Sequence, residues 1–360
     1  MDAPFYAKRI AQVRAALHAK RADALLVTHP PNIVYLCGFT GDSGYLLVEE
    51  HRTTLFTDGR FTVQAHEEAP GAKLVIQRGS LTSTVGTRLS RLKLTVAYSP
   101  THLTLSTWHA LHKAAGSKVR WHAAEGIVED LRAIKSAAEV ATIREAGKLA
   151  VQVMQEVIGL VRPGVRELDL AAEIGYRFRR KGATGESFDA IVASGPRSAL
   201  PHARPTERRI GKNELVVLDL GAILRRYCSD LTRTVFVGRA PARVRRWYQA
   251  VQDAHGAACD ALHPGAQAQD IDHAARQVLT RNKLGRYFVH STGHGLGLEI
   301  HEAPRLGRGQ QTRLQAGSVV TIEPGVYIEG VGGIRIEDDA WVTPSGSELL
   351  TTLGRDLLEL

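Results

Sequence analysis

The stretch LVVLDLGAILRRYCSDLTRTVFV, residues 215–237, decides the fold of the C-terminal part of this 360-residue chain. Two apolar runs with a strand-like pattern are joined by a short polar turn, which predicts a β-hairpin. Asp219 lies inside the first strand pattern and Asp230 inside the second, eleven residues further on. That spacing can bring the two carboxylates side by side across the pair.

An aspartate in the middle of an apolar strand is costly to bury unless another group pairs with its charge. Two such carboxylates close together repel each other, so the pKa of one rises unless a cation lies between them. A cation that prefers oxygen ligands is one solution. Separate ion pairs, for example with Arg233, are the other, and the hairpin alone leaves both open.

Further along the chain, HSTGHGLGLEIHEAP, residues 290–304, places His290, His294 and His301 among glycines. Imidazole is a metal ligand and a proton carrier near neutral pH, and glycine lets the backbone approach a site closely. A loop with surface histidines has the same composition. The spacing differs from that of the HExxH helix of zinc proteases, so this segment alone also leaves both interpretations open.

Two further carboxylates interrupt strand patterns near the C-terminus. Glu323, in SVVTIEPGVYI (318–328), directly precedes a Pro-Gly turn signal. In GGIRIEDDAWV (332–342), alternation puts Ile334 and Ile336 on one face and Glu337 on the other. Each segment alone is also typical of a strand with a solvent face. Together, four carboxylates and one imidazole lie in or beside apolar strands: Asp219, Asp230, Glu323, Glu337 and His294.

This combination predicts a pair of metal ions. Four negative charges balance two divalent cations, before any bridging hydroxide is counted. Oxygen-rich ligands with one nitrogen suit Mn²⁺, Co²⁺ or Zn²⁺ better than a metal that prefers cysteine. Two such ions about 3.5–4 Å apart make a nucleophile from water and polarise a carbonyl or phosphoryl oxygen. We expect Mn²⁺ first, with Co²⁺ and Zn²⁺ as alternatives.

The same residues resemble the five-ligand site of the pita-bread metallopeptidases, the family of methionine aminopeptidase, aminopeptidase P and prolidase. The matching strings are DLGA (219–222), SDLTRT (229–234), GHGLGLEIHE (293–302), IEPG (322–325) and GGIRIED (332–338). NIVYLCGFTGDSGYLLV (32–48) and LRAIKSAAEVATIREA (131–146) resemble the creatinase-type N-terminal domain and the start of the catalytic domain. Because methionine aminopeptidases usually lack that N-terminal domain, the proline-specific branch is the closer match.

The resemblance implies a role for each metal ligand. Asp219 would bind one ion and His294 the other, while Asp230 and Glu337 would bridge them. Glu323 would bind the same ion as His294 and act as general base for the bridging water, so that a metal-bridged hydroxide is the nucleophile.

The resemblance also implies roles around the ligands. His202, in ALPHARP (199–205), would lie near the scissile bond, and His301 would hydrogen-bond the carbonyl oxygen. His202 or His301 would support the departing imino nitrogen. His290 and Arg335 would line the pocket for the proline ring and the groups beyond it.

The implied activity is hydrolysis of Xaa-Pro bonds in di- or oligopeptides. We favour a Xaa-Pro dipeptidase (prolidase), because Arg335 could bind the free proline carboxylate in bidentate fashion. Aminopeptidase P, which acts on longer peptides, is the alternative, and motifs barely separate the two. Creatinase shares both domains but does not keep the metal ligands. Creatinase is therefore disfavoured, because all five ligands are present here. The complete ligand set also disfavours a non-catalytic peptide- or nucleic-acid-binding relative.

Two departures from the family pattern bear on substrate preference and loop shape. Arg197, in SGPRSAL, stands where many relatives carry Asn. Arg226 directly precedes Tyr227, where a Gly is frequent. Neither residue is at a ligand position.

The remaining pattern predicts two domains. Residues 1–128 alternate helix and strand signals, which indicates an α/β domain, and the resemblance implies that it is a creatinase-like N-terminal domain. Residues 34–39 in it are expected to be a strand. In residues 129–360, helical patterns flank strand patterns, which indicates an α+β architecture, and the resemblance implies a pita-bread catalytic domain with a curved, mainly antiparallel sheet. A long amphipathic helical stretch spans 126–155, with a capping box at Ser136 and Glu139.

Composition excludes other classes of protein. A chain with 44% hydrophobic and 23% charged residues is typical of globular proteins. The net charge of +9 is spread along the chain without a basic, aromatic-rich run, which favours a solvated surface over nucleic-acid binding. Three scattered cysteines argue against a disulfide framework, and no apolar run reaches the roughly 18 residues of a membrane span. We expect a cytoplasmic protein without membrane or nucleic-acid partners, and the resemblance implies a homodimer.

Overall fold

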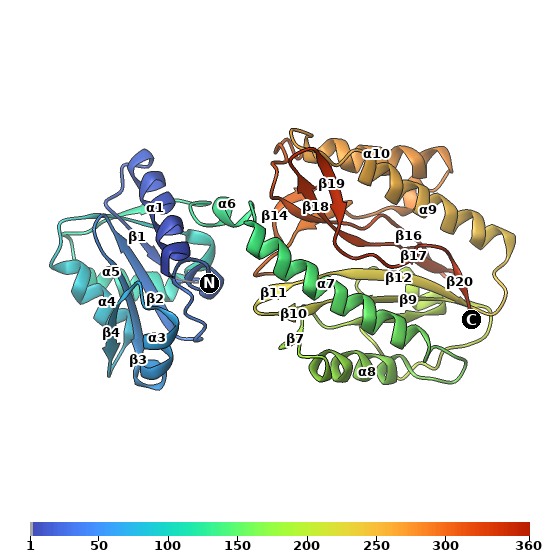
Figure 1. Ribbon diagram of the computed structural model, residues 1–360, viewed down its shortest axis with the longest axis horizontal. Coiled ribbons are helices and arrows are strands. Elements are labelled where there is room, and N and C mark those ends of the chain that lie inside the picture. Colours follow the sequence, from blue (N-terminus) through green and yellow to red (C-terminus); the bar gives the residue numbers. More distant parts are fainter. Residues whose placement is uncertain (1–2) are drawn as a thin grey trace. The chain divides into compact units, whose positions relative to one another are not determined.

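The structure, a computed structural model, describes residues 3–360. It divides into two compact units, one ending at Arg132 and the other comprising Ala133–Leu360 (Figure 1). The sequence pattern places the boundary after residue 128, and the difference is the short helix α6 (Glu129–Arg132). The Asn32 amide donates a hydrogen bond of 2.6 Å to Glu129, and Arg132 donates one of 2.7 Å to the Asn32 amide oxygen. These bonds hold α6 to the first unit.

The first unit contains a six-stranded mixed sheet with the order β4-β3-β2-β1-β5-β6. β1 pairs in parallel with β5 and antiparallel with β2. Val85 of α4 and Leu111 of α5 pack in one buried cluster with Leu26 and Leu47 of the strands. The predicted α/β organisation is therefore confirmed. The elements are α1 (Ala3–Ala19), β1 (Ala24–Val27), α2 (Pro30–Cys37), β2 (Gly44–Glu49), β3 (Thr53–Asp58), α3 (Thr62–Glu68), β4 (Lys73–Gln77), α4 (Leu81–Ser90), β5 (Thr95–Tyr98), α5 (Leu105–Ala115) and β6 (Arg120–Ala123).

One local prediction in this unit is wrong, because most of residues 34–39 belong to helix α2 and not to a strand. Pro30 stands in the first turn of α2, where its fixed φ suits a helix and its missing N–H costs nothing. Gly38, with a φ of 87°, ends the helix and donates its N–H to the Val34 carbonyl. Since α2 is buried over most of its surface, its sequence lacks the alternating polarity that marks an exposed helix.

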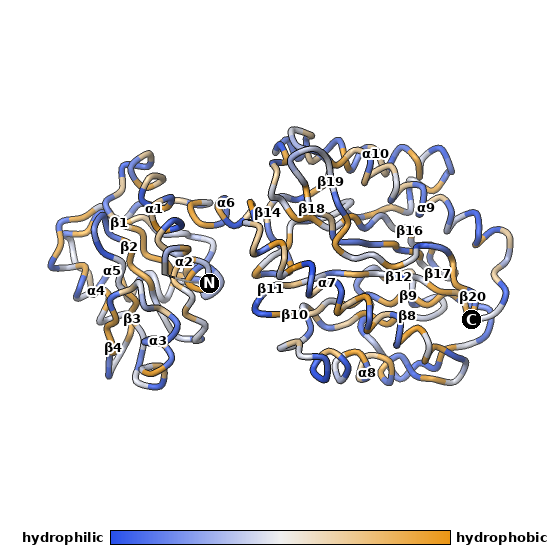
Figure 2. Tube along the Cα trace, viewed as in Figure 1, coloured by the Kyte–Doolittle hydropathy of each residue, from blue (hydrophilic) through white to orange (hydrophobic). Residues whose placement is uncertain are grey.

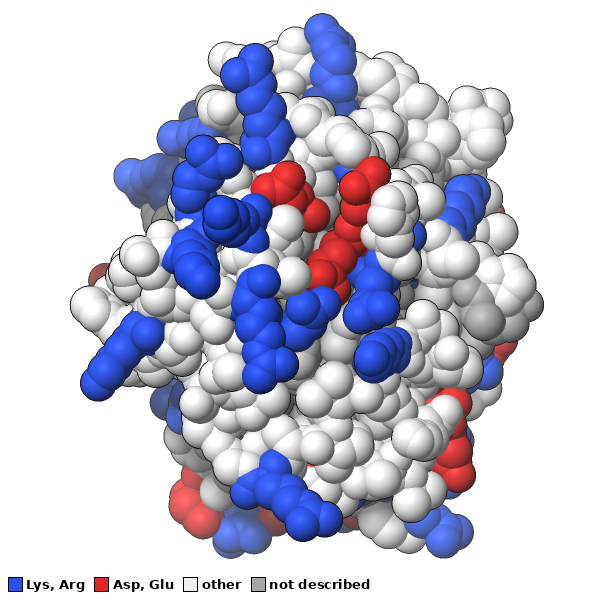
Figure 3. Space-filling view, turned by 90° about the vertical axis from the view of Figure 1, so that its left-hand side faces the viewer, with Lys and Arg blue, Asp and Glu red and all other residues white. Residues whose placement is uncertain are grey.

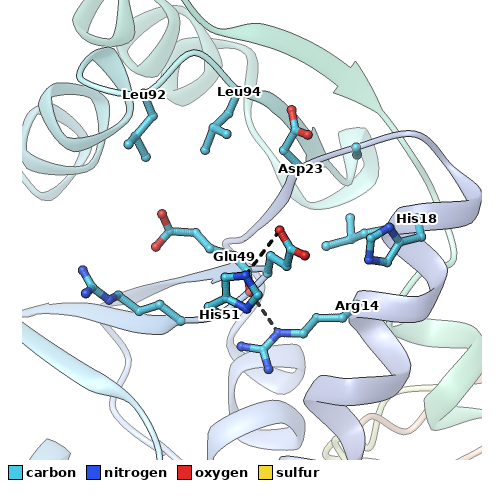
Figure 4. A pocket seen from close by; sticks show the side chains of 11 residues that line it. Arg14, His18, Asp23, Glu49, His51, Leu92 and Leu94 are labelled. Atoms are coloured by element: carbon cyan, nitrogen blue, oxygen red, sulfur yellow. Dashed lines mark hydrogen bonds and ion pairs between the residues drawn. The ribbon is translucent and has the colours of Figure 1, made fainter.

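The surface of the first unit is rich in charge. The face seen in Figure 3 carries Lys and Arg side chains around a smaller number of acidic ones. A pocket of about 390 Å³ in this unit is lined by residues that include Arg14, His18, Glu49 and His51 (Figure 4). Arg14 Nε donates to the Glu49 carbonyl oxygen over 2.9 Å. Every residue predicted to bind metal lies instead in the second unit.

In the second unit, helices flank sheets that are antiparallel apart from one pairing, which confirms the predicted α+β organisation. One sheet has the order β20-β12-β9-β8, another the order β14-β13-β15-β18-β19, and β16 pairs with β17. The predicted capping box at Ser136 and Glu139 begins α7. No helix among residues 3–360 is both long and apolar enough to cross a membrane. The main elements are α7 (Ala137–Ile158), α8 (Glu167–Arg180), β8 (Ile191–Ser194), β9 (Glu214–Leu220), β12 (Leu231–Val237), α9 (Ala242–Asp260), α10 (Ala268–Arg281), β13 (Gly293–Gly295), β14 (Glu302–Leu306), β15 (Val319–Ile322), β16 (Gly325–Ile328), β17 (Gly332–Arg335), β18 (Asp338–Thr343), β19 (Gly346–Leu349) and β20 (Leu358–Glu359).

Two apolar clusters hold these helices against the strands. Phe178 of α8 packs in a cluster with Leu218 of β9. Val251 of α9 and Leu279 of α10 pack in a second cluster with Ile322 of β15. Figure 2 shows hydrophobic residues along the strands and mixed polarity along α8, α9 and α10. Burial of each large apolar side chain contributes roughly 1.5–3 kcal/mol, so α8, α9 and α10 are held firmly against the strands.

The predicted hairpin is formed by β9 and β12, with Asp219 opposite Thr232. Asp230 directly precedes β12 and does not lie inside it. The tip is a separate ladder of β10 (Ala222–Leu224) and β11 (Tyr227–Cys228). Its turn residues Arg225 and Arg226 have φ values of 47° and 75°. Two consecutive positive φ angles are typical of a type I′ turn, which favours glycine, so Arg226 occupies a position that glycine adopts more easily.

Candidate metal centre

The five predicted metal ligands converge in the second unit. Asp219 lies near the end of β9, Asp230 precedes β12 and His294 is in β13, while Glu323 follows β15 and Glu337 precedes β18. Ligand atoms of Asp230, His294 and Glu337 all lie within 4.8 Å of one another. His294 Nε2 lies 3.7 Å from Asp230 Oδ2 and 3.8 Å from Glu323 Oε1. Two sheets thus bring together residues that are far apart in the sequence.

Glycines on both sides of His294 make this convergence possible. A Cβ atom on Gly293 would lie 1.9 Å from the carbonyl oxygen of Thr321, and one on Gly295 would lie 2.2 Å from that of Ala303. No side chain fits at such distances. β13 therefore approaches β15 and β14 closely enough to carry His294 into the carboxylate cluster.

Burial and mutual repulsion make the carboxylates reluctant to ionise. Burial, followed by the negative charge of neighbouring carboxylates, raises the pKa of both Asp230 and Glu337 well above the usual range. Burial raises the pKa of Glu323 to about 8, against the lowering effect of Arg335. Among residues 3–360, the buried Oδ1 atoms of Asp219 and Asp230 accept no hydrogen bond. Unpaired buried carboxylate oxygens and raised pKa values are what a bound cation would relieve.

His294 presents the correct nitrogen to this cluster. Its Nδ1 lies 3.1 Å from the Gly295 carbonyl oxygen, which can only accept, so Nδ1 carries the proton. Nε2 is then the free lone pair that faces the carboxylates. Burial, followed by the charge of His301, lowers the pKa of His294 to about 4. The ring is thus neutral near pH 7, as a metal ligand must be.

Arg335 contacts protein groups and not open solvent. Its guanidinium donates to Asp219 Oδ2 over 2.7 Å, to the Tyr327 hydroxyl over 2.7 Å, to the Pro201 carbonyl over 3.1 Å and to Thr232 Oγ1 over 3.1 Å. Only 4% of the side chain is exposed. A guanidinium so engaged has little left for a substrate carboxylate, which removes the physical reason for expecting it to bind one. The geometry supports a role in fixing Asp219.

The three other predicted histidines lie near the cluster. His290 Nε2 bonds the Tyr327 hydroxyl over 2.8 Å, and burial lowers its pKa to about 4. The His301 ring centre lies 4.3 Å from that of His294. His202 and His301 are exposed. Burial lowers the pKa of His301 as well, and the electrostatic effect of the nearby His202 adds to the lowering at both His290 and His301. The exposed pair can therefore reach a substrate.

Several supporting residues are missing from the sequence prediction. Tyr327 joins His290 to Arg335 through its hydroxyl. Thr232 donates a 2.6 Å hydrogen bond to Glu337 Oε2, and Asp339 accepts one of 3.0 Å from the Asp230 backbone. Such bonds orient the ligands themselves. The polar residues of SDLTRT and the tyrosine in GVYI stand among apolar strand residues. This difference in polarity is the sequence signal by which the supporting residues could have been found.

Comparison with known families assigns the class of protein. Residues 141–344 match the family described as "Metallopeptidase family M24", and residues 9–134 match the family described as "Creatinase/Prolidase N-terminal domain". The chain belongs to metallopeptidase family M24, a family of hydrolytic enzymes, and carries the creatinase-type N-terminal domain. The resemblance noted in the sequence is thereby confirmed.

Individual relatives narrow the comparison. The Xaa-Pro dipeptidase of Pyrococcus furiosus is 35% identical over 344 residues, which cover 93% of this chain and 95% of that protein. The solved structure of a Xaa-Pro dipeptidase from Bacillus anthracis has a TM-score of 0.95 and 36% identity, covering 99% of this chain and all of that one. An X-Pro aminopeptidase from Thermotoga maritima has a TM-score of 0.88 and 32% identity, covering 95% of this chain and all of that one.

Proposed function

We propose that this protein is a metal-dependent exopeptidase that hydrolyses Xaa-Pro bonds, foremost as a Xaa-Pro dipeptidase. The observation that carries the proposal is the largely buried cluster of four carboxylates and one neutral imidazole, with two carboxylate oxygens left unpaired. Asp219, Asp230, His294, Glu323 and Glu337 would hold two divalent cations, Mn²⁺ first and Co²⁺ or Zn²⁺ as alternatives. Two such cations, when bound, supply a nucleophile from water and polarise the scissile carbonyl.

The chain's own residues then divide the proton work. Glu323, whose pKa lies near 8 without cations, accepts the proton of the attacking water, and nearby cations would bring that pKa down. His301 donates a hydrogen bond to the substrate carbonyl oxygen. His202 supports the departing imino nitrogen of proline, which carries no proton of its own in the peptide. His290, bonded to Tyr327, lines the proline pocket.

Arg335 takes a different role from the one expected from the sequence. In this proposal it holds Asp219 and Tyr327 in place and is a positioning residue. The preference for a dipeptidase therefore no longer rests on this arginine. It rests on the similarity to Xaa-Pro dipeptidases along nearly the whole chain, while aminopeptidase P stays as the alternative because of the similar Thermotoga structure. Cytoplasmic location and a homodimer stay predictions.

Two peptides separate these activities. Protein loaded with Mn²⁺ is incubated with Ala-Pro and with an Ala-Pro-Yaa-Yaa tetrapeptide, and released proline or alanine is measured. A dipeptidase releases proline from Ala-Pro and leaves the tetrapeptide intact. Removal of alanine from the tetrapeptide would identify an aminopeptidase P. Inactivity on both, with two equivalents of Mn²⁺ bound, would exclude the proposal. His294→Ala should lose metal and activity together, whereas Arg225→Ala, at an exposed ion pair, should lose neither.

A further inference from the structure

We propose that Arg197 and the buried Glu167 form a clasp that positions His202 over the metal centre. The inference rests on the proposed function, in which His202 acts on the substrate. Its subject is the segment from residue 195 to residue 205, which we call the His202 loop. The clasp consists of the Glu167 carboxylate, which binds both ends of the loop, and the Arg197 guanidinium, which connects Glu167 to the backbone of the loop.

Glu167, at the beginning of α8, ties both ends of the His202 loop to one point. Its side chain has no exposed surface. Oε1 accepts hydrogen bonds from Ser194 N over 2.9 Å and from Ser194 Oγ over 2.8 Å. Oε2 accepts from Thr206 N over 3.0 Å and from Thr206 Oγ1 over 2.8 Å. The residues directly before and after the loop are thus fixed by four hydrogen bonds to one buried carboxylate.

Arg197 forms two further hydrogen bonds inside the loop. Its Nε donates to Glu167 Oε2 over 3.2 Å, and its NH2 group donates to the Arg204 carbonyl oxygen over 2.6 Å. One planar guanidinium therefore connects the tied base of the loop to a carbonyl two residues after His202. Asparagine has a single short amide group that could not span both acceptors, and lysine has one ammonium in place of a fork. The two contacts made by residue 197 thus depend on its being an arginine.

The opposite side of the loop contacts the metal centre. Ser198 Oγ accepts a hydrogen bond of 2.8 Å from Gly333 N in β17. The Pro201 carbonyl accepts one of 3.1 Å from Arg335, the residue that also holds Asp219. His202 directly follows Pro201 and stands two residues before Arg204, so the backbone that carries its ring is held on both sides. Loosening the clasp should move His202 while leaving the ligands in place.

A double-mutant cycle tests this role. Arg197→Ala should lower kcat for Ala-Pro about tenfold and leave KM within twofold, because small displacements of a group at the reacting bond are costly. Arg197→Lys should retain part of the activity. In a His202→Ala background, Arg197→Ala should cause no further loss, since both changes act through one side chain. Bound Mn²⁺ should stay unchanged in all variants, and Arg225→Ala should match the wild type.

Hydrogen exchange gives a readout that does not depend on activity. Amides of residues 198–205 should exchange at least tenfold faster in Arg197→Ala than in the wild type, while the peptide containing His294 is unaffected. An equal loss of kcat in both backgrounds, or unchanged exchange in the His202 loop, would overturn the clasp. Wild-type protein that binds Mn²⁺ but leaves Xaa-Pro peptides intact would overturn the proposed function instead, and the exchange measurement would still decide whether the clasp exists.

Discussion

Replacing Arg335 with lysine separates positioning of Asp219 from binding of a substrate carboxylate. Lysine keeps the positive charge, so a purely electrostatic role would survive. It cannot keep the geometry, because one ammonium cannot reach all four acceptors of the guanidinium at Asp219, Tyr327, Pro201 and Thr232. We therefore expect Arg335→Lys to damage the site without changing its net charge.

The size of the effect follows from the lost hydrogen bonds. If lysine keeps two of the four contacts, two buried acceptors lose their donor, and each costs about 1–3 kcal/mol. The free energy of unfolding of the metal-free protein should fall by roughly 2–6 kcal/mol. Since Asp219 is no longer held, kcat should fall by the same factor for every substrate that the protein cleaves.

Urea unfolding in a chelator measures the first quantity, and steady-state kinetics on Ala-Pro and on Ala-Pro amide measure the second. The amide lacks the proline carboxylate, so it serves as the control. A KM that rises a hundredfold for Ala-Pro alone, with an unchanged unfolding free energy, would refute the positioning role. It would restore the carboxylate-binding role expected from the sequence.

Four further outcomes are expected. Arg226→Gly should raise the free energy of unfolding by roughly 0.5–1 kcal/mol, because glycine adopts the observed φ of 75° more easily, and thermal melting with unchanged kcat checks this. Lys135→Met should cost about 3–5 kcal/mol in urea unfolding, since Lys135 and Glu302 form a buried pair at 3.1 Å with 1% and 6% exposure; a loss below 1 kcal/mol would contradict it. His301→Ala should lose most activity with full metal content, and normal turnover would reject its role. Metal-free protein should lose stability as pH rises from 6.5 to 8, because folded Glu323 stays protonated up to a pKa near 8 whereas the unfolded residue is already ionised. The buried histidines have the opposite effect on stability, but only below about pH 6.5. Melting curves without this pH dependence, or with the same pH dependence in Glu323→Gln, would count against the prediction.

The sequence points to the proposed metal ligands because a carboxylate stands out in an apolar strand, whatever its partners are. The glycines beside His294 also carry a local signal of close approach. In contrast, the sequence pattern around Arg335 shows only which face of β17 this residue occupies. Its contact with Asp219 depends on the register of strands that are distant in the sequence. Helix α2 escapes prediction because tertiary burial, and not local periodicity, stabilises it. Arg197 is visible as an unusual residue, but its partner Glu167 is visible only in the folded chain.

If the proposed ligands bind cations, their spread over residues 219–337 couples cation binding to completion of the fold. An unfolded or partly folded chain offers isolated carboxylates with weak affinity, so the ions select the native state by mass action. Well above the dissociation constant, each tenfold rise in free cation adds about 1.4 kcal/mol per site to stability. A shortage of divalent metal would then shorten the lifetime of this polypeptide against proteolysis, in addition to abolishing its proposed activity.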